Sequence, residues 1–377
     1  MERQNYGPWY WIMQIGIGYV VIVVLLSAAN LGSALANSGE WFWMCMAAMI
    51  LNTAYFVSFQ FFGGPKYKLE PSVQHACFCV GCGVGMFFAG TVLGMVSLKS
   101  YSNLFPIAVV AVMGLLLTGA PSNLMVSMAV RAKGISPSLP FVVSNSSNFW
   151  VYLLAPILGV ALPKYFKQAS WNFWSGAGLF TIIIGLVIVK IYGLPVSQRD
   201  VQLNTQQGSE KKLSSGRGLK LWLLEGNWFA KSFAAMLVIT VYLVSFQFFG
   251  KFFRLDPVVQ HSVYLTGMGI GIFMYSKIIG LFPAEEYKKY VPMAMVFLMG
   301  LTIGAWLNNL VMMALRTPGL NPGLPFIVAN TFQVTVYVVG HWLALRFSQF
   351  NKTVFNWQTG LGIVVVLIAL FIIKLFG

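Results

Sequence analysis

The heptad Val-Ser-Phe-Gln-Phe-Phe-Gly occurs twice in this chain without change, at residues 57–63 and again at 244–250. The match extends to both sides of the heptad with slips of only a residue or two. Trp-Phe recurs upstream at 41–42 and 228–229, and Val-Gln-His recurs downstream at 73–75 and 259–261. Leu-Pro-Phe follows at 139–141 and 324–326. An even match over this length indicates an internal duplication rather than a compositional accident.

The composition indicates a membrane protein. Hydrophobic residues make up 58% of the 377 residues and charged residues only 9%, whereas a soluble domain is roughly 25% charged. A membrane-spanning helix needs about 20 mainly apolar residues, and lipid tolerates only helices or closed barrels. The apolar runs here are long rather than short and alternating, which excludes a barrel. We therefore expect an all-α, multi-pass integral membrane protein, most simply in the cell (inner or plasma) membrane.

Eleven apolar runs of spanning length divide into one plus five plus five. The first, at about 9–30, has no partner in the second half and is too long for the hydrophobic region of a signal peptide. The other runs lie at 41–62, 72–96, 105–132, 139–162 and 171–194, and at 232–253, 258–281, 290–315, 324–347 and 353–375. The expected organisation is an extra helix at 1–39, a first repeat at 40–194, a polar linker at 195–220 and a second repeat at 221–377.

The odd number of helices in each repeat has a topological consequence. Five crossings separate equivalent helices, so if one crosses outward its counterpart crosses inward, and the two repeats are inverted. Inverted repeats are an architecture of secondary transporters, which alternate between two gates around a site near the midplane. The distribution of Lys and Arg over the loops favours a cytoplasmic amino terminus.

Each five-helix unit resembles the drug/metabolite transporter superfamily, in particular its EamA-type members. The resemblance rests on Leu-Glu-Pro at 69–71 or Leu-Asp-Pro at 255–257 opening the second helix, and on a glycine-bearing third helix that runs into a short loop. It rests also on Leu-Pro-Phe at the start of the fourth helix and on Gly176 or Gly360 opening the fifth. The resemblance implies a ten-helix bundle that moves small solutes by alternating access. Members usually keep both ends of this unit in the cytoplasm, which disagrees with the orientation drawn from charge.

Asparagines inside the spanning runs are the candidate substrate ligands, because buried polar residues in a membrane are costly and often functional. Asn123 and Asn145 flank the loop near residue 135 and lie about 15–18 Å from it at 1.5 Å per residue. Asn309 and Asn330 stand in the same relation to the loop near residue 320. We expect a midplane site formed by these four residues together with Ser122, Asn148, Asn308 and Gln333. Alternatively, these side chains only join helix to helix, at about 0.6–2 kcal/mol for each hydrogen bond.

Two histidines and two glutamines occupy equivalent positions near helix ends. His75 and His261 fall one turn into the second helix of each repeat, and Gln60 and Gln247 lie inside the duplicated heptad. Histidine titrates near neutral pH, so these four residues are candidates for gating or proton handling. The alternatives are that each histidine is a helix-start residue bonded to a neighbouring loop and that each glutamine satisfies the adjacent bend.

Several residue types are absent or unpaired. No Asp or Glu lies deep in any of the eleven runs, which disfavours a proton-coupled exporter of cationic drugs. The net charge of +15 favours neutral-polar or anionic solutes, although positive loops and anionic lipids explain part of it. The glycines at 81, 83 and 85 and at 267, 269 and 271 fit close helix packing better than phosphate binding. The four cysteines fit small apolar residues better than metal ligands.

Together these features predict a secondary transporter of a small polar or anionic metabolite, with no catalytic residue, no metal and no cofactor. The expected partners are the small-molecule substrate and the lipid bilayer, without nucleic acid, and homodimerisation stays open. The alternatives are a proton-coupled drug or cation exporter, a lipid flippase or scramblase, and a non-transporting sensor. A membrane-embedded group transferase would need a catalytic constellation near an interface, where only scattered histidines are available.

Overall fold

The computed structural model describes residues 39–64, 66–130, 139–169, 171–192, 227–281, 284–347 and 356–376. Within these ranges all regular structure is helical, and no strand occurs. Seven of the described helices are long and apolar enough to cross a membrane, as in an all-α integral membrane protein. The expected helix at 9–30 and the linker at 195–220 lie outside the described residues.

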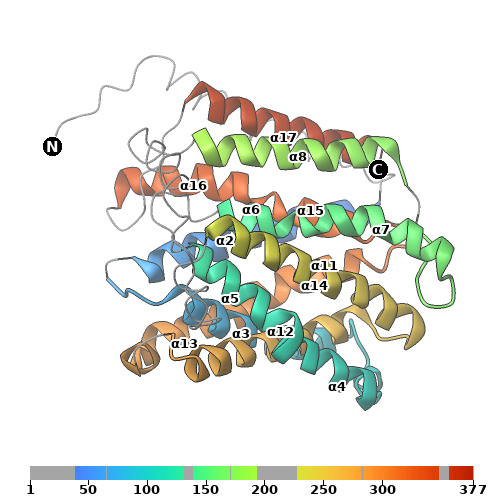
Figure 1. Cartoon of the computed structure of the whole chain (residues 1–377), viewed down its shortest axis with the longest axis horizontal. Helices are drawn as coiled ribbons and strands as arrows, with labels where there is room; N and C mark the ends of the chain where they lie inside the picture. The colour runs from blue at the N-terminus through green and yellow to red at the C-terminus, as the bar shows by residue number, and fades with distance from the viewer. Residues whose placement is uncertain are drawn as a thin grey trace, which may run out of the picture.

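The first half of the chain forms helices within a few residues of the predicted runs (Figure 1). In order these are α2 (Glu40–Gly63), α3 (Pro71–Val92), the 3₁₀ turn η1 (Leu98–Tyr101), α4 (Leu104–Val112), the π-helical turn η2 (Met113–Leu117), α5 (Gly119–Val130), α6 (Leu139–Asn145), α7 (Ser147–Ala161) and α8 (Phe173–Tyr192).

The second half repeats this order. It contains α11 (Trp228–Phe252), α12 (Pro257–Ile278), the 3₁₀ turn η3 (Ala284–Lys288), α13 (Tyr290–Met299), the π-helical turn η4 (Gly300–Gly304), α14 (Ala305–Ala314), α15 (Gly323–Asn330), α16 (Phe332–Arg346) and α17 (Trp357–Phe376). The third predicted run of each half thus contains a π-helical turn and the fourth is broken in two, neither of which the sequence had indicated.

The duplicated heptad forms the last turns of α2 and α11 and leads into the same reverse turn in both halves. The amide of Leu69 donates to the carbonyl oxygen of Phe62 at 2.9 Å, and that of Leu255 donates to Phe249 at 3.2 Å. The residue before each leucine has a positive φ, 47° at Lys68 and 54° at Arg254. The next helix then begins in each case with a proline at its first position, where a missing N–H costs nothing.

Helices α3 and α12 cross at glycines. A Cβ atom on Gly83 would collide with the backbone of Ser262 and Thr266, and one on Gly269 would lie 2.6 Å from the carbonyl oxygen of Ala76. Further along α3, Gly90 lies against Val258 near the start of α12. The two helices therefore run antiparallel, and their glycines allow the backbones to approach closely, as in membrane helix pairs.

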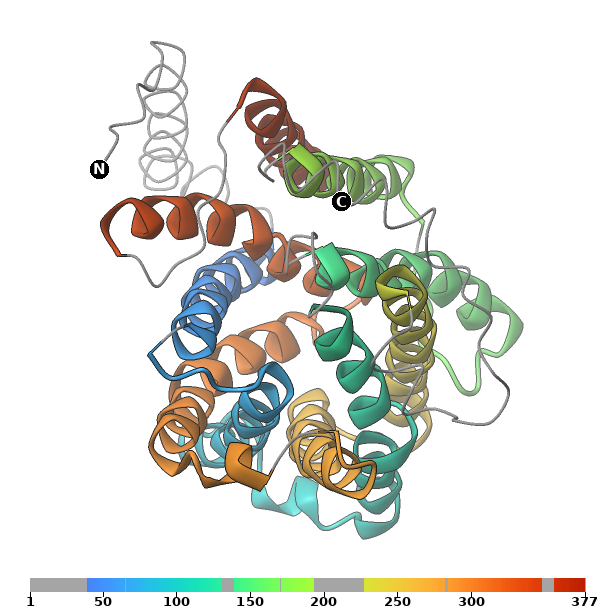
Figure 2. The same cartoon turned by 60° about the vertical axis from the view of Figure 1, so that its left-hand side comes forward.

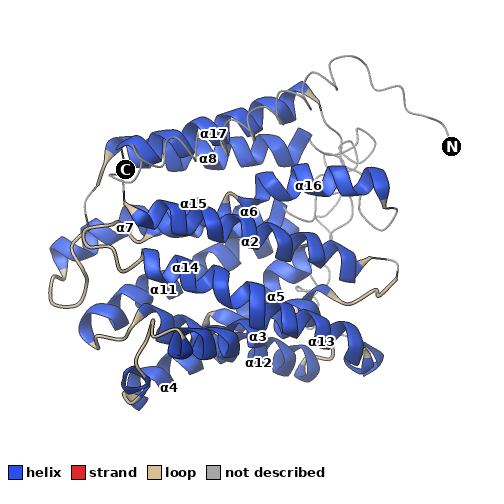
Figure 3. Cartoon of the chain, turned by 180° about the vertical axis from the view of Figure 1, so that it is seen from behind, coloured by secondary structure: helices blue, strands red, loops and turns tan. Residues whose placement is uncertain are grey.

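Helices α8 and α17 lie side by side at one end of the molecule (Figures 1 and 3). Gly178 packs on Ile373, and Gly185 packs on Gly362 and Val366, so this pair of equivalent helices also runs antiparallel. Figure 2 shows the pair set apart from the remaining helices. A buried apolar cluster that includes Leu179 and Ile327 joins it to α15.

In the rest of the bundle the two halves interlock. Helix α2 packs on α14 and α15, and its counterpart α11 packs on α5 and α6. The first helix of each half thus finds its main partners among the third and fourth helices of the other half.

Candidate functional site

A hydrogen-bonded chain of three side chains links α2, α3 and α5. The hydroxyl of Tyr55 lies 2.8 Å from Nδ1 of His75, and Nε2 of His75 lies 2.9 Å from Oδ1 of Asn123. The ring of Tyr55 stacks on Phe78 with 3.5 Å between centroids. This arrangement, the first triad, connects helices that are otherwise in limited contact.

The second half builds the same chain from α11, α12 and α14. The hydroxyl of Tyr242 lies 2.9 Å from Nδ1 of His261, and Nε2 of His261 lies 3.1 Å from Oδ1 of Asn308. Tyr242 stacks on Tyr264 with 3.4 Å between centroids. We call this set the second triad.

The asparagine amide groups decide the direction of the hydrogen bonds. Nδ2 of Asn123 donates to the carbonyl oxygen of Gly119 at 3.0 Å, and Nδ2 of Asn308 donates to that of Gly304 at 2.9 Å. Each Oδ1 is therefore an acceptor, so Nε2 of each histidine carries a proton and Nδ1 accepts from the tyrosine hydroxyl. A neutral imidazole satisfies every member of the chain.

The triads exclude the alternative given for the two histidines, whereas their role in gating or proton handling stays a prediction. Neither His75 nor His261 is bonded to a neighbouring loop, because the partners of each lie on the first and third helices of its own half. The sequence contained the signal, since Tyr55 and Tyr242 also match in the repeat, but tyrosine was not considered as a partner.

The structure also corrects one asparagine pairing. Asn308, not Asn309, takes the place of Asn123, because the first half has one residue more after its π-helical turn. Gly85 packs on Leu301 and Ala305, whereas its counterpart Gly271 packs on Leu115 and Ala120. Asn309 is itself completely buried, and its amide meets no hydrogen-bond partner among the described residues.

Asn145 and Asn330 are the last residues before the breaks in the two fourth helices. At each break the next residue turns its hydroxyl back onto the helix. Ser146 donates to the carbonyl oxygen of Val143 at 2.6 Å, and Thr331 donates to that of Val328 at 2.7 Å. Such back-bonding competes with the helical hydrogen bonds, which gives a physical cause for the breaks.

Both breaks contact the first helix of the other half. Ser146 lies 3.0 Å from the sulfur of Met236 on α11, and Thr331 lies 3.1 Å from the sulfur of Met49 on α2. The contacts are equivalent, so both halves build the break in the same way.

The side chains of Asn145 and Asn330 are half-buried and make no hydrogen bond to the described part of the chain. Their helices cross antiparallel, since Nδ2 of Asn321 donates to the carbonyl oxygen of Tyr152 at 3.1 Å while Gly323 packs on Asn148. The fourth helices of the two halves therefore pack antiparallel through α7 and α15. Each half carries one asparagine at its break whose amide makes no hydrogen bond to the described residues.

The other predicted ligands have different surroundings. Nδ2 of Asn148 donates to the carbonyl oxygen of Asn145 at 2.9 Å, and the hydroxyl of Ser122 donates to Gly119 at 3.0 Å. Gln333 is buried immediately after the second break. Gln60 is half-buried beside Gly340, and its counterpart Gln247 is buried.

Phe56 is a neighbour of the breaks that sequence reasoning missed. It stacks on Phe332 with 4.3 Å between centroids and meets Phe141 edge-on at 5.1 Å. Phe332 follows the second break and Phe141 precedes the first. The equivalent position in the second half is Leu243. Only the first helix of the first half therefore places an aromatic ring at this position beside the breaks.

Ionisable groups and metal ligands are scarce around the breaks. Among the described residues no group of three His, Cys, Asp or Glu side chains could hold a metal ion, and the four cysteines are free and buried. The ion pair between Arg316 and Asp256, at 2.7 Å, lies at the ends of helices. The residues that follow Asn145 and Asn330, Ser146 and Thr331, are polar and uncharged, and the buried Lys231 lies on α11 five residues before Met236.

Comparison with known proteins identifies the fold alone. No protein-family model matches the chain, and no curated protein matches it. Eleven chains of solved structures match. One of them, described only as "Crystal structure of protein", covers 90% of this chain and 98% of its own at 12% identity, with a TM-score of 0.54. This likeness indicates a shared fold, and its description carries no statement about activity.

Proposed function

We propose that this chain is a secondary active transporter that moves a small polar or anionic metabolite across the membrane by alternating access. The observation that carries the proposal is the pair of interrupted fourth helices, which cross antiparallel and end at Asn145 and Asn330 with uncommitted amides. Interrupted membrane helices with free polar groups are found where a protein lines a substrate cavity.

The proposed topology is eleven spanning helices, with the helix at 9–30 preceding two inverted repeats of five. Antiparallel packing of α3 with α12 and of α8 with α17 supports the inversion, because equivalent helices of inverted repeats run in opposite directions. The sequence resemblance to EamA-type drug/metabolite transporters supports the two repeats of five helices, and the helix at 9–30 is additional to that ten-helix unit.

The chemistry of the site favours a neutral or anionic solute. An asparagine amide offers two donor hydrogens and an acceptor oxygen, and so it can bind hydroxyl, carbonyl or carboxylate groups. A cationic drug or a coupling cation would call for a buried carboxylate, and the described spanning helices carry none near the breaks. We therefore rank proton-coupled cation export below metabolite transport.

In this proposal the two triads hold helices together and do not carry protons. Each triad ties the first three helices of one half into a unit while the main packing of those helices is with the other half. Two such units can rock against each other around the breaks without losing their internal hydrogen bonds, as alternating access requires.

The test begins with thermal unfolding of the purified protein against sugars, nucleosides, amino acids and carboxylates. A compound that stabilises the protein is then followed as a radiolabelled solute in proteoliposomes. We expect Asn145→Leu and Asn330→Leu to abolish both the thermal shift and the flux. The matched control is Asn103→Leu, since Asn103 is exposed at the start of α4 and makes no capping hydrogen bond. Flux at the wild-type rate in the folded double variant would refute the site.

A further inference from the structure

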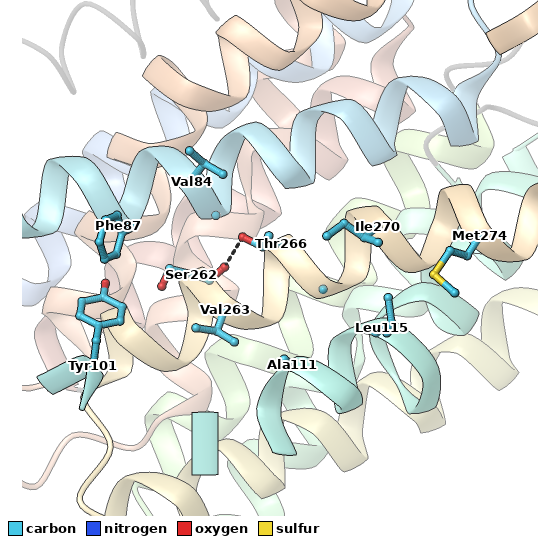
Figure 4. A pocket seen from close by; sticks show the side chains of 12 residues that line it. Val84, Phe87, Tyr101, Ala111, Leu115, Ser262, Val263, Thr266, Ile270 and Met274 are labelled. Carbon is cyan, nitrogen blue, oxygen red and sulfur yellow. Dashed lines mark hydrogen bonds between the residues drawn. The ribbon is translucent and has the colours of Figure 1, made fainter. Parts of the chain in front are cut away.

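A pocket lies on one flank of the α3–α12 crossing, and no residue of the broken helices lines it. Its volume is about 460 Å³, and its walls come from α3, α12, η1, α4 and η2 (Figure 4). The lining is almost entirely apolar, with Val84, Phe87, Leu115, Val263 and Ile270 among its residues. Ile270 and Met274 are exposed on its outer side, so the pocket opens laterally from the bundle at the depth of the spanning helices.

The pocket is elongated along α12. Its lining residues on this helix recur every three to four positions from Ser262 to Met274, which at 1.5 Å per residue corresponds to about 18 Å. One leaflet of the hydrocarbon core is about 15 Å thick. The groove thus has the length of one acyl chain and follows the helix along which such a chain would lie.

The duplication supplies an internal comparison, because the opposite flank of the same crossing is lined by the equivalent residues. Gly267 packs on the backbone of Ala111, and its counterpart Gly81 packs on the backbone of Phe297, so Ala111 and Phe297 are equivalent positions. A phenylalanine occupies one flank where the other has a methyl group. Other lining positions also differ from their counterparts, such as Thr266 from Val80 and Met274 from Phe88. Ala111 and Phe297 differ most in side-chain size.

Positive charge surrounds one end of the groove. Tyr101 closes this end and packs edge-on against Phe87 at 4.9 Å, and Lys99 lies two residues before it in η1. Phe253 contacts Phe105 beside this end, which places the exposed Lys251 and Arg254 there as well. The nearby carboxylate of Asp256 is already paired with Arg316, so the three exposed cations are not neutralised by it.

From these observations we propose that the groove binds one acyl chain of an anionic phospholipid, with its phosphate held by Lys99 and the neighbouring cations. The chain length, the lateral opening and the basic end each match a part of that molecule. Anionic headgroups are attracted to basic residues at a membrane surface. The site is separate from the breaks at Asn145 and Asn330, so it stands independently of the proposed transport function.

Native mass spectrometry of the purified full chain with phosphatidylglycerol and phosphatidylcholine of matched acyl chains tests the site. We expect one tightly retained phosphatidylglycerol in the wild type and its loss in Ala111→Phe, which fills the groove as Phe297 fills the other flank. The control Val112→Phe adds the same ring at the adjacent exposed position and should retain the lipid. We expect Lys99→Gln to lower the preference for phosphatidylglycerol about fivefold.

A gain-of-binding variant keeps the test decisive if Ala111→Phe does not fold. Phe297→Ala should open the equivalent flank and raise the number of retained lipids from one to two. The second lipid should show no preference for phosphatidylglycerol, because Glu285 takes the place of Lys99 at that end. If Ala111→Phe folds and still retains the lipid, the groove is not the binding site. If Ala111→Phe does not fold, a single retained lipid in Phe297→Ala refutes the proposal in the same way. Equal retention of both lipids by the wild type would overturn the role of the basic residues.

Discussion

Removing the tyrosine hydroxyl from a triad gives a direct measure of what these hydrogen bonds contribute. In Tyr55→Phe the ring stays stacked on Phe78, 3.5 Å away, and only the bond to Nδ1 of His75 is lost. Side-chain hydrogen bonds inside membrane proteins average about 0.6 kcal/mol and reach about 1.7 kcal/mol. Because the loss leaves a buried acceptor without a donor, we expect a destabilisation near the upper value, about 1–1.7 kcal/mol.

The duplicated structure provides the matched control for this experiment. Tyr242→Phe removes the equivalent bond, 2.9 Å long instead of 2.8 Å, and should have the same effect within about 0.5 kcal/mol. The two changes should add in the double variant because the triads share no member. Combining Tyr55→Phe with His75→Leu should instead show a coupling energy of about 1 kcal/mol.

The free energy of unfolding in mixed detergent micelles, measured over a denaturant series with each variant, is the appropriate assay. Additivity between Tyr55 and His75, together with a loss below about 0.3 kcal/mol for Tyr55→Phe, would show that the triad is incidental to stability. A different cost for Tyr242→Phe would instead show that the two triads are not equivalent in solution.

Three further predictions concern the crossing of α3 with α12, the heptad turn and the ion pair at the start of α12. Gly83→Val places a side chain against the backbone of Ser262 and Thr266, and we expect a loss of about 3 kcal/mol or failure to fold. Thermal unfolding measures the loss, with Gly63→Val as the control, because Gly63 is exposed and a Cβ there would meet nothing closer than 3.9 Å. Lys68 and Arg254 have strained backbone conformations, with φ angles of 47° and 54°. Replacing either residue by glycine should remove the strain and raise the free energy of unfolding by about 0.5–1 kcal/mol. An unchanged unfolding midpoint would show that the strain does not affect stability. Asp256→Asn weakens a half-exposed ion pair and should cost at most about 1 kcal/mol, with a smaller cost at 1 M salt.

The sequence predicted the helices more closely than it predicted the site. Long apolar runs and duplicated motifs fixed ten helical segments to within a few residues of the described helices, since in lipid the backbone has no alternative to a helix. The breaks after Asn145 and Asn330 were missed because Asn-Ser and Asn-Thr are unremarkable pairs in sequence. Their effect depends on the serine and threonine hydroxyls turning back onto the helix beside a methionine of the other half.

The sequence grouped asparagines that the structure separates, and their binding of a substrate stays a prediction. Asn123, Asn145, Asn308 and Asn330 all matter in the structure, but two serve the triads and two remain uncommitted. The sequence could not separate them, because helical depth alone does not show which way a side chain points. Asn309 was paired with Asn123 because the sequence alignment of the two halves did not include the single extra residue near Thr118.

The antiparallel glycine contact between α3 and α12 has the form of a self-complementary surface. Gly83 packs on the backbone at Ser262 and Thr266, and Gly269 packs on the backbone at Ala76 and Val80. Each half therefore contributes one glycine and the backbone segment on which the glycine of the other half packs. Such isologous contacts are the ones that pair identical subunits around a two-fold axis. Here both surfaces belong to one chain, so the two flanks of the contact need not be identical, and they differ at Ala111 and Phe297.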